Sequence, residues 1–148
     1  MRDTAQLLYE WRQTRLQLKE QFCESNLQKA IDWWKTLDYH TQGFNYDHMN
    51  TWPDVWEYIT EGFYTNSGNG LGCFYTVYHA APKKNPEVWL IHDLEYGDMY
   101  LVCYVDGYIL NRSSGKLDKY EDIQNDIDIL EKYSADTIIE TLKNRDDK

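Results

Sequence analysis

The segment from residue 71 to residue 111 constrains the fold of this chain most strongly. It contains four short stretches that are rich in aromatic and β-branched residues, a composition typical of strands. These stretches cover residues 71–80, 87–93, 99–105 and 108–111. Asp106 and Gly107 form the kind of two-residue link that joins antiparallel strands in a tight hairpin. The sequence therefore predicts a four-stranded antiparallel meander over about residues 71–111.

The residues before this meander have helical patterns. Apolar side chains recur at the helical period through residues 3–21, where glycine and proline are absent. A second helix is expected to start at Ser25, because Gln28 three residues later completes a capping box. A third helix is predicted over residues 52–63, with Thr51 as its cap.

The residues after the meander also favour helices. An acidic amphipathic helix is predicted over residues 118–132, and a last helix near 135–143. The fold class that follows is α+β, with N-terminal and C-terminal helices packed on one face of the sheet. A chain of 148 residues fits one domain. We divide it into a helical arm (1–37), a loop and helix (38–70), the antiparallel sheet (71–111) and an acidic helical tail (112–148).

Charge and hydropathy limit the partners of the chain. The net charge is −10, and no cluster of lysine and arginine is present. Because nucleic-acid binding needs such a cluster, we expect no nucleic-acid partner. No apolar run approaches the length that crosses a bilayer, so we expect no membrane partner either.

The cysteines and histidines form no metal-ligand spacing, so we expect no metal and no cofactor. The three cysteines fit reduced thiols in a cytosolic compartment. Cys73 and Cys103 fall in the middle of predicted strands, where cysteine is usually a small buried hydrophobe. The alternative is a nucleophilic thiol at Cys73 or Cys103 that shares its proton with His92.

Tryptophan and tyrosine are unusually abundant, with 6 Trp and 13 Tyr. Such residues are enriched where proteins bind one another. We expect part of this surplus to lie at a contact surface. The candidate interface residues are Trp33, Trp34, Trp52 and Trp56.

A string of motifs resembles a small family of tailed-bacteriophage proteins. The motifs are the tandem tryptophans of WWKT, then WPDVW, then LGCFYT, and then a hairpin that ends in YILN. They span about residues 33–111. The resemblance implies a phage protein present first in the host cytoplasm and then in the virion.

The order of helix and meander is also similar to the core of transglutaminase-like folds. That resemblance places the family's cysteine near Thr65, its histidine near Met99 and Tyr100, and its aspartate at Asn111. None of the three reactive residue types is kept at these positions. The resemblance therefore implies a degenerate core with no catalytic residues.

The preferred hypothesis is a non-enzymatic phage protein, a virion or assembly component. It would act through contacts with other phage structural proteins or, as a homo-oligomer, with itself. Two alternatives stay open. One is a cysteine-dependent hydrolase or acyl transferase of transglutaminase-like fold, and the other is an acidic inhibitor of a host enzyme.

Overall fold

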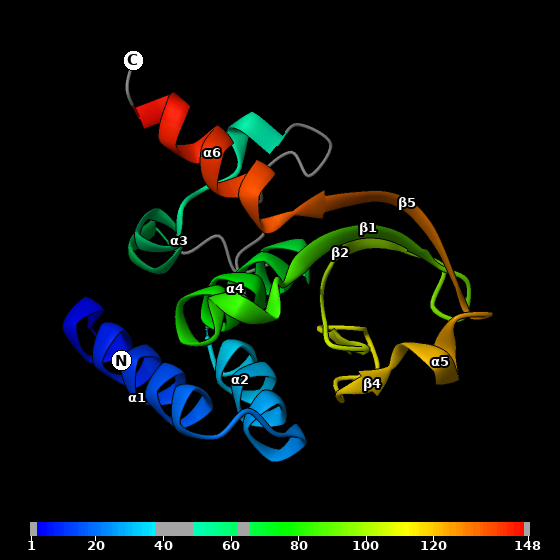
Figure 1. Ribbon diagram of the computed structural model, residues 1–148, viewed down its shortest axis with the longest axis horizontal. Helices are drawn as coiled ribbons and strands as arrows, with labels where there is room; N and C mark the ends of the chain where they lie inside the picture. Colours follow the sequence, from blue (N-terminus) through cyan, green and yellow to red (C-terminus); the bar gives the residue numbers. More distant parts are fainter. Residues whose placement is uncertain (1–2, 38–48, 62–65, 147–148) are drawn as a thin grey trace.

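The computed structural model describes residues 3–37, 49–61 and 66–146. Helices gather on one side of a strongly curved antiparallel sheet (Figure 1). This arrangement confirms the expected α+β class. In chain order the elements are α1 (Thr4–Glu20), α2 (Glu24–Lys35), the 3₁₀ turn η1 (Met49–Thr51), α3 (Val55–Glu61), α4 (Asn66–Ala80), the 3₁₀ turn η2 (Pro82–Lys84), β1 (Glu87–Asp93), β2 (Met99–Val105), β3 (Tyr108–Leu110), β4 (Asp118–Lys119), α5 (Tyr120–Ile123), β5 (Ile127–Ser134) and α6 (Ala135–Asp146).

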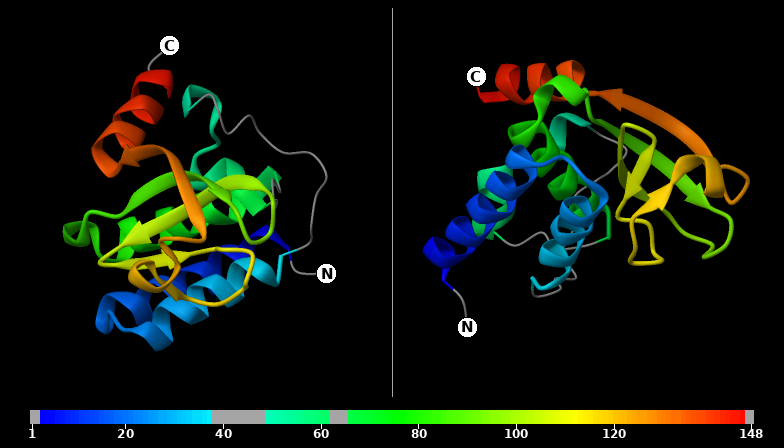
Figure 2. Two further views of the ribbon diagram at one scale, coloured as in Figure 1. Left: turned by 90° about the vertical axis from the view of Figure 1, so that its right-hand side faces the viewer. Right: turned by 60° about the horizontal axis from the view of Figure 1, so that its bottom comes forward.

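The sheet has the strand order β4-β3-β2-β1-β5, and each neighbouring pair is antiparallel. The predicted hairpin turn is confirmed, because Asp106 and Gly107 both have positive φ angles, of 52° and 85°. Two positive φ angles in a two-residue turn match the right-handed twist of the strands that it joins. β5 runs along β1 and leads directly into α6 (Figure 2).

The predicted strand over residues 71–80 is wrong, because these residues form most of α4. Every residue from 71 to 77 is buried, so α4 lacks the polar face of a surface helix. It packs on β2 and contacts α1, α2 and α3. Periodicity cannot separate a buried helix from a buried strand when apolar residues surround the axis.

The predicted helix over residues 118–132 is also wrong. These residues form β4, the short α5 and most of β5, which pairs with β1 at the edge of the sheet. Residues 112–148 are therefore not a helical tail, although α6 confirms the last predicted helix.

Two helix N-termini differ from expectation. Cys23, not Ser25, is the N-cap of α2, and a capping box between Asp54 and Glu57 begins α3.

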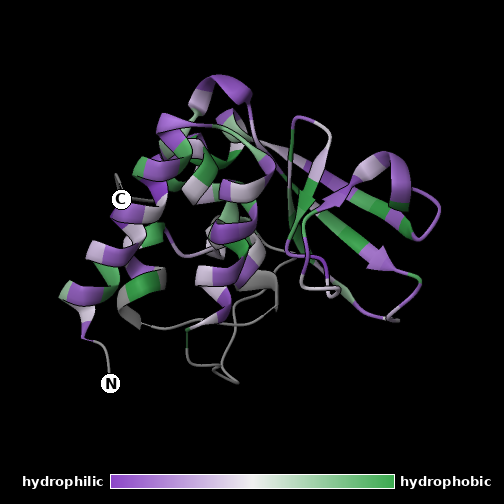
Figure 3. Ribbon diagram, turned by 90° about the horizontal axis from the view of Figure 1, so that it is seen from below, coloured by the Kyte–Doolittle hydropathy of each residue, from purple (hydrophilic) through white to green (hydrophobic). Residues whose placement is uncertain are grey.

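The main core lies between the sheet and the helices, and a smaller one covers the other face of the sheet. In Figure 3 hydrophobic residues dominate the middle of the strands, while the outer helices are largely hydrophilic. The indole N–H groups of Trp11 and Trp34 both donate to the hydroxyl of Thr76, at 2.9 Å each. This shared acceptor ties α1 and α2 to α4.

Candidate functional site

The N-terminal half of α4 lies directly on β2. A side chain at Gly70 would overlap the carbonyl of Leu101, so only glycine allows this contact. Cys73, almost one turn further along α4, lies close enough to Cys103 on β2 to influence its ionisation. The two contacts show that α4 and β2 run in the same direction. The start of α4 therefore lies toward the start of β2.

The spacing along both elements places two side chains at this end. From Gly70 back to Asn66 is about 6 Å along a helix, and from Leu101 back to Met99 is about 7 Å along a strand. Met99 thus lies at the level of the first turn of α4. Its cross-strand partner on β1 is His92. Because alternate strand residues share a face, His92 and Met99 lie on the same face as the core residues Leu90 and Leu101.

His92 is half-buried, and nothing in the described part of the chain forms a hydrogen bond or ion pair with its imidazole. Asn111, the residue after β3, is 9% exposed and donates from Nδ2 to the carbonyl of Leu101 at 3.4 Å. Its φ is +76°, a left-handed conformation. Such conformations cluster at functional sites. We call His92, Met99, Asn111 and the N-terminal end of α4 the helix-end site.

The transglutaminase-like positions fall partly on this site. Thr65 lies outside the described residues. Tyr100 does not contribute, because its ring lies in the core on the opposite face of the sheet. Its hydroxyl donates to Asp93 Oδ2 at 2.6 Å and accepts from the Ser113 N–H at 2.9 Å. Burial, together with the bond to Asp93, raises the pKa of Tyr100 to about 12. Met99 is the residue of this pair that faces α4.

The two thiols proposed as nucleophiles are both fully buried, at 0% exposure. Burial raises the pKa of the Cys73 thiol to about 12 and that of Cys103 well above its ordinary value. Only the thiolate is nucleophilic. Neither cysteine can therefore act with His92. Cys23, at the start of α2, is the thiol with partial exposure.

Three of the four proposed interface tryptophans belong to the core. Trp33, Trp34 and Trp52 are 9%, 1% and 0% exposed. The fold has two apolar cores to fill, and large rings fill them. Trp56 is 53% exposed and keeps the expected accessibility.

A buried charged network was missed by sequence reasoning. Asp93 is 0% exposed and forms an ion pair with Arg112, whose Nε lies 3.4 Å from Oδ2. Arg112 also bonds to Glu95 at 2.7 Å. The backbone N–H groups of Glu95 and Tyr96 donate to Asp93 Oδ1. The sequence contained one indication of this network, because an aspartate at the end of a strand, such as Asp93, commonly accepts hydrogen bonds from the N–H groups of the following turn.

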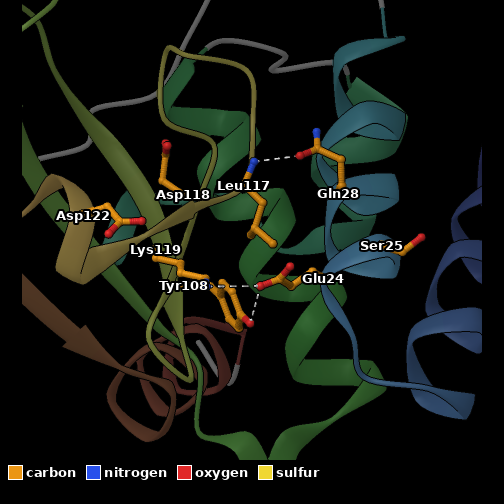
Figure 4. Close-up of a pocket in the computed structure, with 8 residues that line it drawn as sticks. All are labelled: Glu24, Ser25, Gln28, Tyr108, Leu117, Asp118, Lys119 and Asp122. Atoms are coloured by element: carbon orange, nitrogen blue, oxygen red, sulfur yellow. Dashed lines mark hydrogen bonds and ion pairs between the residues drawn. The ribbon is translucent and has the colours of Figure 1, made fainter.

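A polar pocket of about 420 Å³ lies between α2 and the β3–β4 edge (Figure 4). Its carboxylates are Glu24, Asp118 and Asp122, and Lys119 supplies a cation. A hydrogen bond of 2.7 Å from the Leu117 N–H to Gln28 links the two walls.

Among the described residues no group of three histidines, cysteines or acids could hold a metal ion. None of the described helices is both long and apolar enough to cross a membrane.

Solved structures of LapG from Legionella pneumophila resemble this chain. The calcium-bound structure has a TM-score of 0.74 and 16% identity, and the match covers 91% of this chain and 78% of LapG. For the EGTA-treated structure the TM-score is 0.73 and the identity 14%, with 98% and 91% covered. A third LapG structure gives a TM-score of 0.73 at 15% identity, with 98% and 89% covered. The chain shares the LapG fold.

LapG is a protease with a transglutaminase-like fold, and the likeness agrees with the fold that the transglutaminase-like resemblance implied. Likeness at this identity establishes the fold alone. No family model and no curated protein matches the sequence. Nothing supports the resemblance to phage proteins. The hypothesis of a non-enzymatic virion component was wrong, since the structures that match have an enzyme fold.

Proposed function

We propose that this chain is a hydrolase or acyl transferase that acts at the helix-end site, with His92 as its proton-transfer group. The observation that carries the proposal is the half-buried imidazole of His92, which pairs with Met99 in the sheet and has no hydrogen-bond or ion-pair partner among the described residues. The likeness to LapG supports it, because the fold is that of an enzyme class. The imidazole of His92 comes from β1. The transglutaminase-like resemblance places the family's histidine on the neighbouring strand β2, near Met99 and Tyr100.

The surroundings suit acyl transfer. Free backbone N–H groups and the dipole at a helix N-terminus stabilise negative charge, as an oxyanion requires. A neutral imidazole takes up a proton and returns it within the pH range of most enzymes. Asn111 holds the end of β3 against the carbonyl of Leu101 and so fixes the wall of the site.

The nucleophile in this proposal is a hydroxyl and not a thiol. Thr65 stands directly before α4 in the sequence and at the family's cysteine position. Its proton would pass to His92 while its oxygen attacks the acyl carbon. His92 would then return the proton to the leaving amine or alcohol. Water, or an acceptor amine, would release the acyl group from Thr65 in the second step.

The test is turnover of a panel of fluorogenic peptide amides and esters by the full chain. His92→Gln should lower kcat by about 100-fold or more, the usual contribution of a general base. Thr65→Ala should remove the activity, and Thr65→Cys should retain or raise it. Lys143→Gln, an exposed residue of α6, is the control and should leave the rate unchanged.

Two results would contradict the proposal. One is a wild-type chain that turns over none of the panel. The other is an activity that survives His92→Gln but disappears in Cys23→Ser. Circular dichroism of each variant separates loss of activity from loss of fold.

A further inference from the structure

A second surface combines an exposed aromatic ring with two arginines. Trp56 on α3 is 53% exposed, and its ring packs edge-on against Trp11 with centroids 5.6 Å apart. Trp11 is fully buried and hydrogen-bonded to Thr76, so it provides a rigid base. His79 on α4 packs against the same ring, with centroids 5.7 Å apart.

The arginines of α1 complete this surface. The Arg15 guanidinium lies 4.0 Å from the ring centroid of Trp11, and its Nε is buried without a hydrogen-bond partner. Burial and the neighbouring charge of Arg12 both lower the pKa of Arg15. Within residues 3–37, 49–61 and 66–146 no carboxylate pairs with Arg12 or Arg15. We call Arg12, Arg15, Trp56 and His79 the Arg–Trp patch.

Two adjacent unpaired arginines are unexpected in a chain with 25 acidic and 15 basic residues. Like charges side by side repel each other, and a nearby carboxylate would relieve the repulsion. Trp and Arg are also the residues most enriched at binding hot spots. The patch thus offers an apolar ring for one side chain and guanidinium groups for carboxylates beside it.

We propose that the Arg–Trp patch docks an acidic segment of another protein, which places an apolar side chain on Trp56 and carboxylates on Arg12 and Arg15. Charge complementarity selects this occupant. A nucleic acid fits less well, because two arginines neutralise few phosphates.

This docking surface is independent of the proposed function. The Arg–Trp patch meets α4 at His79. This residue lies thirteen positions after the start of the helix, about 20 Å along its axis. The helix-end site lies at the other end. A variant can therefore lose one property and keep the other.

Fluorescence anisotropy with three labelled probes tests the proposal. The probes are a peptide of alternating glutamate and leucine, the same peptide with lysine in place of glutamate, and a single-stranded oligonucleotide. The acidic peptide alone should bind, and its affinity should fall as NaCl is raised. Arg12→Gln and Trp56→Ala should each weaken binding by at least fivefold, while His92→Gln should not change it.

The matched controls are Tyr96→Ala and Lys143→Gln, which remove an exposed ring and an exposed charge elsewhere. Both should bind like the wild-type chain. Unaltered unfolding midpoints for Arg12→Gln and Trp56→Ala show that the variants are folded. The proposal would be overturned if the acidic peptide did not bind, if the lysine peptide bound equally well, or if the oligonucleotide bound more strongly. It would also be overturned if the control variants weakened binding as much as Arg12→Gln and Trp56→Ala do.

Discussion

The three cysteines of this chain differ in their exposure to solvent. Cys73 lies in the buried part of α4, and Cys103 belongs to the same core from β2. Both lose the hydration that a thiolate needs, which is why the pKa of each is raised. Cys23 lies at the start of α2 and is only partly covered. The same residue type thus serves as core filler in two places and stays accessible in the third.

Thiol labelling should follow this division. In the native protein at pH 8, iodoacetamide should modify Cys23 and leave Cys73 and Cys103 unmodified, because neither is exposed. Mass spectrometry of peptides after a timed reaction measures the three rates. In urea all three should react at similar rates. Fast native labelling of Cys73 or Cys103 would show that this core opens.

The packing of α4 explains both the success and the failure of prediction at the level of elements. Outward-facing polar residues gave α1 and α2 a clear period, and strands β1 to β3 carried β-branched residues and a turn signal. Residues 71–77 of α4 are all buried and so present no polar face, and β5 is an exposed edge strand with an acidic, helix-like composition. Their identities depend on tertiary contacts, which a local pattern does not contain.

Gly72 tests how tightly α4 is packed. Alanine in a helix interior is normally about 1 kcal/mol more favourable than glycine. A Cβ at Gly72 would, however, lie 2.8 Å from the ring of Trp34. Gly72→Ala should therefore lower the free energy of unfolding by about 1–3 kcal/mol. Urea denaturation measures this loss, and a stabilised variant would mean that Trp34 moves aside without cost.

The candidate site shows the same limit as the elements. His92 was identified from the sequence as a reactive group, but its expected partners were buried thiols. The pairing of His92 with Met99 depends on strand register, and the side of the sheet that Tyr100 faces depends on where α4 packs. Neither can be derived from residue spacing alone. The buried network around Asp93 joins residues 19 positions apart and was not expected at all.

On the scale of the whole molecule, two cores share one sheet. The larger core joins helices from both ends of the chain, and the smaller one closes the far face with α5 and β5. Asp93 and Arg112 link the turn after β1 to the loop after β3, next to this smaller core. Removing one partner of a buried ion pair leaves a charge without compensation.

Arg112→Met should therefore destabilise the whole fold by about 3 kcal/mol, because the carboxylate of Asp93 stays buried. Glu95→Gln should cost little, since Glu95 is half-exposed and water replaces its bond. Equilibrium unfolding in urea compares the two. A double variant that also carries Asp93→Asn should lose less than the sum of the single losses. Strict additivity would show that the pair is not coupled.

The single hydroxyl of Thr76 that accepts both Trp11 and Trp34 has a consequence for biosynthesis. These bonds join residues 65 and 42 positions apart in the sequence. Until residue 76 has been synthesised, the two indole N–H groups can bond only to water, and α1 and α2 cannot form these links to α4. The native packing of α1 and α2 on α4 therefore requires that the chain has been made at least as far as α4.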